Sequence, residues 1–585
     1  MNGPAPLPPY TIHRLGDRAL LVDLPDLHAV LALRDLLSQA RRSGVDDIVP
    51  AARTLAVLFD PKRLSADAAR TWLDRMLERM PAEGGAASAS RDDAESVVVD
   101  VVYDGEDLDE VAALVGITTD KLVRRHTDAT WRVAFSGFAP GFGYLVTDDE
   151  WFDVPRRSSP RTRVPSGAVG LAGGFSGAYP REGPGGWQLI GRTDAPLWRP
   201  DSNRPALLTP GKTVRFRAVE VSGRPVPSEA ESLETAPSDA TDGTPATARM
   251  VGRKTHDRPP GEPLSEAADR AFSGGSFGGD LRATATSPAT PDPAVTVLQS
   301  GPQLLIEDLG RPASASIGAG RSGALDRGAL RLGNRLIGNA ESAAGLEAVV
   351  GARLRFERPR WFAVTGARGA LTLGGHPIEP DAAWRAESGE VLELGAAEHG
   401  LRYVVALRGG IAVPHELGSA SCDIGARIGP APLTDGDPIV LADDVAGGIP
   451  AVDALTVWSP PDDEVDVHVV AGPRQDWFTR EAVVAFYETG WQVTQDSNRV
   501  GARLHSDDVM LQRSDDPAHP SELPSEPMVP GAIQVPPSGE PTVLLADGPV
   551  TGGYPVIAVV ADADLDLFAQ LRPGQRVRFR HSRPY

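Results

Sequence analysis

Residues 137–145, which read Gly-Phe-Ala-Pro-Gly-Phe-Gly-Tyr-Leu, are the densest run of glycine and aromatic residues in the chain. Glycines such as Gly141 let backbone N–H groups approach a ligand closely, as they do in many anion-binding loops. The alternative is a corner of a β-barrel that packs on the three aromatic side chains. The run therefore predicts a shaped loop that either binds a ligand or turns a barrel corner.

Arginines follow this loop. Four of them, including Arg161, lie between 156 and 163 and are interrupted by prolines, and Arg192 follows the run Pro-Gly-Gly-Trp at 184–187. A guanidinium group binds a carboxylate or phosphate through two parallel hydrogen bonds, and prolines stiffen the backbone that presents it. These arginines are therefore candidate anion-binding residues. A solvated basic loop is the alternative.

His126 lies at the end of a predicted helix over 107–128, just before the strand that leads to the glycine-rich loop. A histidine at this place could act as a general base or contact a phosphate. The alternative is a cap at the helix C-terminus, and the residues alone favour it.

The second half of the chain carries carboxylates in similar positions. Asp308 begins the run Asp-Leu-Gly-Arg that ends at Arg311, and Asp326 opens a predicted helix over 326–340. Together with Glu347, these two aspartates could bind magnesium or position water. In the alternative interpretation Asp326 is only the helix N-cap.

A polar, glycine-rich set completes the candidates and includes two more arginines. Its members are Arg499, Arg503, Gln534, Thr551, Gly552, Gly553 and Tyr554, and Asn334 and Asn339 could orient a substrate amide. Familiar signatures are missing. Residues 206–213 lack the first glycine of a P-loop, residues 174–178 lack the last glycine of a nucleophile elbow, and no histidine pair has zinc spacing.

The elements that must position these residues occur twice. Residues 208–217 (Leu-Thr-Pro-Gly-Lys-Thr-Val-Arg-Phe-Arg) are echoed at 571–580 (Leu-Arg-Pro-Gly-Gln-Arg-Val-Arg-Phe-Arg). Two further echoes precede them in the same order, 164–169 with 529–533 and 177–180 with 552–555. The chain is therefore predicted to contain two related β-rich modules, with a site between them as the first place to look for function.

Hydrophobic periodicity divides the chain further. Strands near 11–24, 45–49 and 54–59 alternate with helices over 26–43 and 65–80, and the Gly/Ala/Ser stretch 83–90 is a predicted joint. The expected division has five parts, the third a disordered linker rich in Pro, Ser and Asp. The parts are 1–90 (small α+β domain), 91–219, 220–293 (linker), 294–457 and, after a break at 458–465, 458–585.

Composition excludes several classes of protein. A net charge of −21 argues against nucleic-acid and anionic-membrane partners. The single cysteine, Cys422, excludes an internal disulfide and is interpreted as a packed residue. The N-terminus lacks the features of a signal peptide, and no apolar run is long enough to span a bilayer. A cytoplasmic location is therefore expected. The sequence leaves open whether copies of the chain form a homo-oligomer.

Taken together, these motifs resemble two known families. Residues 11–217 look like the KipI/PxpB family, also called allophanate hydrolase subunit 1, through His126 and the runs 137–145, 157–161 and 184–193. Residues 295–580 look like the KipA/PxpC family, allophanate hydrolase subunit 2. That match is carried by the runs 308–311, 322–326, 338–339, 497–504, 531–536 and 551–555.

The resemblance implies a mainly β fold with α+β parts, in which tandem cyclophilin-like β-barrels accompany a small N-terminal α+β domain. It also implies ATP-dependent 5-oxoprolinase activity, in which 5-oxoproline is opened to L-glutamate with a separate PxpA-type (LamB/YcsF) subunit. ATP and Mg²⁺ would be the cofactors. Arginines and backbone N–H groups would hold the triphosphate and a carboxylate would hold the metal.

Two other functions stay open at this point. The same modules resemble the carboxyltransferase part of urea carboxylase, which would require a biotinylated partner because this chain has no biotin-carrier motif. KipI-type proteins are also regulators of histidine kinases, with KipA-type antagonists. Fusion of an inhibitor to its antagonist makes poor regulatory sense, whereas fusion of two parts of one site raises their effective concentration.

Overall fold

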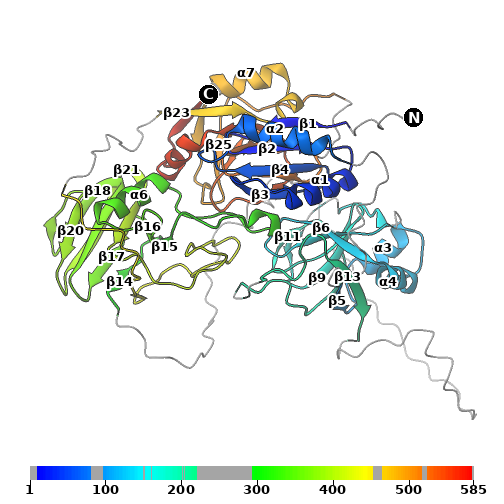
Figure 1. The fold of residues 1–585 in the computed structure, drawn as a ribbon, viewed down its shortest axis with the longest axis horizontal. Coiled ribbons are helices and arrows are strands. Elements are labelled where there is room, and N and C mark those ends of the chain that lie inside the picture. The colour runs from blue at the N-terminus through cyan, green and yellow to red at the C-terminus, as the bar shows by residue number, and fades with distance from the viewer. Residues whose placement is uncertain are drawn as a thin grey trace, which may run out of the picture.

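The computed structural model describes residues 9–80, 96–220, 293–451 and 464–582, apart from 149–151, 158, 160, 201, 203 and 517–522. The predicted linker 220–293, the joint 83–90, the break at 458–465 and the N-terminal six residues lie wholly or almost wholly outside this description. The described chain is mainly β and forms four packed bodies, shown in Figure 1.

The N-terminal body is an antiparallel sheet of order β1-β2-β4-β3 covered by two helices. Its elements are β1 (Thr11–Arg14), β2 (Ala19–Asp23), α1 (Leu27–Gln39), β3 (Val45–Pro50), β4 (Thr54–Phe59) and α2 (Ala66–Leu77). Side-chain oxygens of Asp26 and Ser65 cap the two helices, as N-cap residues do. The strands and helices predicted before residue 80 are confirmed.

The second body is a seven-stranded β-barrel-like sheet of order β12-β9-β10-β7-β6-β13-β5. Its elements are β5 (Ser96–Val101), α3 (Leu108–Leu114), α4 (Thr119–Asp128), β6 (Trp131–Ser136), β7 (Gly143–Val146), β8 (Arg161–Val164), β9 (Ala168–Ala172), β10 (Phe175–Ala178), β11 (Gly183–Gly185), β12 (Gln188–Arg192) and β13 (Thr213–Ala218). The single helix predicted over 107–128 is wrong. Gly116 has a left-handed φ of 72° and Thr118 caps a new helix, so the segment forms α3 and α4.

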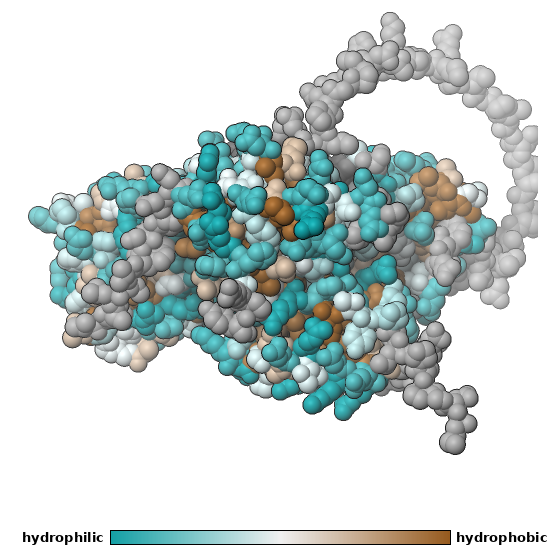
Figure 2. Space-filling model, turned by 90° about the horizontal axis from the view of Figure 1, so that it is seen from above, coloured by the Kyte–Doolittle hydropathy of each residue, from teal (hydrophilic) through white to brown (hydrophobic). Residues whose placement is uncertain are grey.

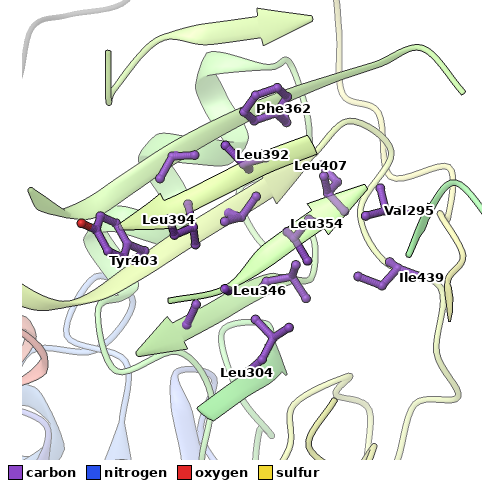
Figure 3. Packing of buried hydrophobic residues seen from close by; sticks show 14 of the residues in the cluster. Val295, Leu304, Leu346, Leu354, Phe362, Leu392, Leu394, Tyr403, Leu407 and Ile439 are labelled. Atoms are coloured by element: carbon purple, nitrogen blue, oxygen red, sulfur yellow. The ribbon is translucent and has the colours of Figure 1, made fainter. Parts of the chain in front are cut away.

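The third body is a sheet of order β15-β16-β21-β17-β14-β22, in which β18 also pairs with β21, and β19 and β20 pair with β18. Its elements are β14 (Val295–Gln299), β15 (Gln303–Glu307), η2 (Ala315–Ile317), α6 (Arg327–Leu336), β16 (Gly345–Val349), β17 (Arg353–Phe356), β18 (Arg360–Leu373), β19 (His376–Pro377), β20 (Ala383–Ala386), β21 (Val391–Leu407) and β22 (Pro438–Ile439). Its core, with Leu346, Leu354, Leu394 and Tyr403, gathers between the strands (Figure 3).

The fourth body is a closed barrel of order β23-β30-β27-β28-β25-β24-β31. Its elements are β23 (Glu464–Ala471), η3 (Gln475–Trp477), α7 (Arg480–Glu488), β24 (Gly490–Val493), β25 (Gly501–His505), β26 (Glu526–Pro527), β27 (Ala532–Gln534), β28 (Thr542–Leu544), β29 (Thr551–Gly552), β30 (Val556–Val560), η4 (Asp562–Ala569) and β31 (Arg576–His581).

The second and fourth bodies repeat one another in detail. In each, the first strand pairs in parallel with the last, β5 with β13 and β23 with β31. In each, a tryptophan indole donates to the carbonyl five residues before it at 3.0 Å, Trp131 to His126 and Trp491 to Phe486. The repeated sequences therefore fold into equivalent modules.

The N-terminal sheet packs on the C-terminal barrel rather than standing apart, as Figure 1 shows for the blue and red elements. Leu15, Leu21 and Val49 share one buried cluster with Ala532 and Val559 of the barrel. None of the described helices is long and apolar enough to cross a bilayer. In Figure 2 the visible surface is mostly hydrophilic with scattered hydrophobic patches.

A buried ion pair fixes this packing. The Arg474 guanidinium donates to Asp23 at 2.8 Å and to Glu526 at 2.9 Å. Burial alone would raise the pKa of Asp23, but hydrogen bonds from Arg474 and His13 lower it to about 2. The first strands of the chain are thereby tied to its last module, more than 450 residues away.

Candidate functional site

The predicted glycine-rich loop meets the second half of the chain. It connects β6 with β7, and the backbone N–H of Phe138 donates to the hydroxyl of Thr551 at 3.0 Å across 413 residues. Gly137 lies so close to Thr551 that a Cβ there would collide with its side chain. Phe138 itself has a left-handed φ of 63°, which is costly for a residue with a Cβ. The structure thus brings two predicted motifs together, one from each half.

The short helix η2 supports this loop from the other side. The N–H of Gly141 donates to Ile317 at 3.3 Å. The N–H of Ser316 donates to Asp47 of the N-terminal sheet at 3.0 Å. Residues 315–318 therefore lie between the first two bodies, although they belong to the second half of the chain.

Aromatic side chains line the first-half side of the contact. Phe138 is 40% exposed and meets Phe142 and Tyr179 edge-on, with ring centroids 5.4 and 5.8 Å away. Burial raises the pKa of Tyr144 to about 12 and raises the pKa of Tyr179 further. Both phenols therefore stay protonated at neutral pH. Tyr554, from the second half, is 42% exposed.

Two charged residues that the sequence motifs did not include, Arg181 and Asp423, interact electrostatically across the two halves. Arg181 directly follows the repeated Tyr-Pro, and burial lowers the pKa of its guanidinium, with Asp423 acting in the opposite direction. Within the described ranges, Arg181 has no hydrogen bond or ion pair. Burial, and then Asp547, raises the pKa of Asp423 to about 6. The position of Arg181 directly after an internal echo was the signal that could have found it.

Arg499 is engaged by carboxylates deep in the second half. Its guanidinium donates to Asp547 at 2.8 Å and Glu347 at 2.6 Å, and lies 3.3 Å from Glu307. Only 3% of its side chain is exposed. Burial raises the pKa of Glu307 well above its usual range, against the pull of Arg499. This network joins the third and fourth bodies, so Arg499 cannot reach a bound anion unless the bodies separate.

Two of the three candidate metal ligands, Asp326 and Glu347, belong to the same buried region. One Asp326 oxygen accepts from Ala329 at 2.7 Å as a helix cap, and the other accepts from Gln570 at 2.8 Å. Glu347 accepts from the N–H of Leu325 at 2.8 Å besides its bond to Arg499. Burial raises the pKa of Asp326 to about 7. Among the described residues, no group of three His, Cys, Asp or Glu is arranged to bind a metal.

His126 lies in the core of the second body. Its ring nitrogens pair with the Tyr103 hydroxyl at 2.7 Å and the Ser176 hydroxyl at 2.9 Å, and it stacks on Phe216 at 4.4 Å. Burial lowers the pKa of His126 to about 3. In the repeated module Phe486 takes this place and stacks on Phe579 at 4.6 Å. These contacts favour a core histidine over a base that touches substrate.

The other predicted arginines already have carboxylate or backbone partners. Arg161 pairs with Asp107 at 2.7 Å, and Arg192 pairs with Asp104 at 3.0 Å on the surface. Arg311 is buried and donates to the backbone of Ser421. Arg503 lies partly buried on β25.

The remaining candidates are divided between the contact and the core. Gln534, half-buried on β27, lies close to Gly552, and Gly553 and Tyr554 follow β29. Asn334 and Asn339 bond to each other at 3.0 Å in the core, and Asp308 binds Ser419 at 2.6 Å. The structure therefore brings Gly141, Thr551, Gly552, Gly553, Tyr554 and Gln534 to the seam between the halves and leaves the other candidates elsewhere.

Comparison with known proteins matches both halves. Residues 10–208 match the family model "carboxyltransferase domain, subdomain C and D", and residues 317–581 match "carboxyltransferase domain, subdomain A and B". The second half is 34% identical to the 5-oxoprolinase C subunit of Escherichia coli over 290 residues, 48% of this chain and 89% of the relative.

Further relatives cover the first half and the whole chain. A 5-oxoprolinase B subunit from Bacillus subtilis is 34% identical over 227 residues, 35% of this chain and 92% of the relative. A urea amidolyase of Lachancea kluyveri is 31% identical over 49% of this chain but only 17% of its own length. The crystal structure of a protein named TTHA0988 superposes with a TM-score of 0.73 at 31% identity, over 98% of this chain and 99% of that one.

Proposed function

The chain belongs to the family of 5-oxoprolinase B and C subunits, fused into one polypeptide, and from that premise we propose that it is the ATP-dependent activating component of a 5-oxoprolinase. In this proposal it phosphorylates 5-oxoproline, and a PxpA-type (LamB/YcsF) partner completes ring opening to L-glutamate. ATP and Mg²⁺ are the expected cofactors.

The observation that carries the proposal is the hydrogen bond between Phe138 and Thr551. The B and C subunits of 5-oxoprolinase are separate proteins in Escherichia coli, and here their glycine-rich loops meet within one chain. A site formed from both explains why the halves are fused, since a linker raises their effective concentration.

The chemistry that such a site must supply is electrophilic activation. A lactam carbonyl is a poor electrophile, so transfer of the γ-phosphoryl group of ATP to the amide oxygen, with release of ADP, converts it into a reactive imidate. Water then adds to the imidate carbon, phosphate leaves, and the ring C–N bond breaks to give glutamate. Such phosphoryl transfer depends mostly on positioning and on charge neutralisation.

The residues at the seam fit these requirements. Free donors suit phosphate oxygens, and we assign this role to Arg181, because the N–H groups of residues 137–139, 141 and 142 already donate within the protein. Mg²⁺ bound with a nucleotide commonly takes only one or two protein carboxylates, and its charge would offset that of the phosphates. We assign the carboxylate to Asp423, whose electrostatic interaction with Arg181 links the halves.

A second function rests on the family models. Both are named for a carboxyltransferase domain, and the urea amidolyase match covers half of this chain. If the chain transfers a carboxyl group, its turnover requires a biotinylated partner rather than the LamB/YcsF-type protein.

The deciding experiment is glutamate release from 5-oxoproline by the full chain, the LamB/YcsF-type partner and Mg-ATP, with each omitted in turn. We expect glutamate only from the complete mixture. Arg181→Gln should lower the rate at least tenfold, while Arg353→Gln, which removes a surface ion pair with Glu393, should leave it unchanged. Absence of both glutamate and ADP in the complete mixture would refute the proposal.

A further inference from the structure

A cavity lies where the N-terminal sheet, the segment after η2 and the C-terminal barrel meet. Its interior holds about 130 Å³ of space for water-sized molecules, which is room for a small ligand only. Much of its wall is apolar. The apolar wall includes Leu58, Phe59, Met528, Leu544, Val550 and Leu565. Because residues of both halves form the wall, the cavity exists only when the halves are docked.

Three arginines, Arg18, Arg321 and Arg327, also line this cavity. Arg18 pairs with Asp562 at 2.9 Å, and Arg327 pairs with Asp562 at 2.7 Å and with Asp566 at 2.8 Å. The positive charges of Arg18 and Arg327 are therefore already balanced by the carboxylates with which they pair.

Arg321 differs from its two neighbours. Across the described ranges its only hydrogen bond from the side chain is Nε to the carbonyl of Leu309 at 3.3 Å, and no carboxylate lies within ion-pair distance. The side chain is solvent-exposed, yet surrounding protein, and then Arg18 and Arg327, lower the pKa of its guanidinium. A side chain that lines a cavity can be both exposed to solvent and close to surrounding protein atoms, as Arg321 is. Within the described part of the chain, its two terminal NH₂ groups are therefore free for a ligand.

The backbone around Arg321 is fixed. Its carbonyl accepts from the N–H of Arg311 at 2.7 Å, and the next N–H, of Ser322, donates to Ala546 at 3.1 Å. The buried Nε of Arg18 also has no partner among the residues that the structure describes. Carboxylates of Asp17 and Asp46 line the cavity as well, so its field suits a single negative charge better than a polyphosphate.

From this geometry we infer that the cavity is a binding site for a small organic monocarboxylate, held by the terminal NH₂ groups of Arg321, with the apolar body of the ligand against the barrel wall. The identity of the carboxylate rests on the proposed function, which makes 5-oxoproline itself the first ligand to test. A planar carboxylate matches the guanidinium fork, and the apolar wall matches a compact ring.

Titration calorimetry of the full chain, without ATP or partner, tests the site. We expect saturable binding of 5-oxoproline, at least tenfold weaker binding by Arg321→Gln, an intermediate loss for Arg321→Lys, and no change for Arg353→Gln. The neutral ring 2-pyrrolidinone should not bind. Equal binding of 2-pyrrolidinone, tighter binding of inorganic phosphate, or unchanged affinity in a folded Arg321→Gln protein would each overturn the inference.

Glutamate assays separate this inference from the function on which it rests. Binding of 5-oxoproline that depends on Arg321, without glutamate formation in the complete mixture, supports the site and counts against the proposed function. Normal glutamate formation by Arg321→Gln, with an unchanged KM for 5-oxoproline, keeps the function and removes Arg321 from the site. Thermal unfolding of Arg321→Gln and Arg321→Lys shows whether either substitution disturbs the fold.

Discussion

His126 provides the strictest test of the site, because a buried core histidine and a catalytic base respond oppositely to one substitution. Burial lowers the pKa of His126 to about 3 in the folded chain, whereas an unfolded histidine titrates near 6.5. Below about pH 6.5 the unfolded chain binds a proton that the folded chain does not bind. The stability of this module therefore falls as the pH falls from about 6.5 towards 3.

The magnitude follows from the two pKa values. One pKa unit corresponds to about 1.4 kcal/mol. At pH 5, roughly 1.5 units below the pKa of the unfolded histidine, the buried neutral histidine therefore lowers the free energy of unfolding by about 2 kcal/mol. The substitution His126→Phe copies the residue of the repeated module, Phe486. At pH 7 it leaves the hydroxyls of Tyr103 and Ser176 without a partner in the core, which costs about 1–3 kcal/mol for each.

The variant should therefore be less stable than the parent at pH 7, and this deficit should shrink by about 2 kcal/mol at pH 5 because phenylalanine does not titrate. Hydrogen exchange of the amides of β6 and β13 measures the opening free energy of this module alone. His468→Gln, on the surface of the other barrel, is the matched control. An equal deficit at both pH values would refute the burial argument, and lost turnover with unchanged exchange would return His126 to a catalytic role.

Three further perturbations test other parts of the structure. Thr551→Val removes the acceptor for the Phe138 N–H, so the glutamate-forming rate should fall about fivefold with little change in thermal unfolding, since one hydrogen bond is worth about 1 kcal/mol. Arg474→Ala leaves the buried carboxylate of Glu526 unpaired beside Asp23, so hydrogen exchange of β1 and β2 should show a loss of about 3–5 kcal/mol. The raised pKa of Asp326 means that stability is lost as the pH rises from about 4 to 7, and Asp326→Asn should flatten that dependence in denaturant unfolding.

Local features of the fold could be predicted from sequence because local chemistry determines them. The strands near 11–24 and the helix that Asp326 caps depend on residues that are close together in the sequence. The break of the expected helix at Gly116 was missed because apolar spacing continues through it.

The composition of the site could not be predicted because it depends on pairing across the chain. Arg499 and Arg181 look alike in sequence, as exposed cations that could bind an anion. The three carboxylates that occupy Arg499 come from distant segments, and only folding brings them to one place. Arg181 is left without such partners among the described residues, so the fold and not the residue type distinguishes the two.

The repeated modules show how one scaffold came to hold two different surfaces. Asp107 and Arg474 occupy equivalent positions, since their N–H groups donate to Leu189 and Val556 of equivalent strands. Each pairs with the residue three positions before the repeated Val-Pro. In the first module this pair is Asp107 with Arg161, and in the second it is Arg474 with Glu526, so the charges are reversed.

This reversal has a structural consequence. In the second module the arginine also reaches Asp23, and the pair is covered by the N-terminal sheet. In the first module the Asp107 carboxylate is buried, and the side chains of Arg161 and Arg157 that pair with it are 16% and 32% exposed. The charge reversal therefore places an arginine in the second module where it can pair with Asp23 at the end of β2 in the N-terminal sheet. The same docking closes the cavity at Arg321, which ties ligand binding to the assembly of the two halves.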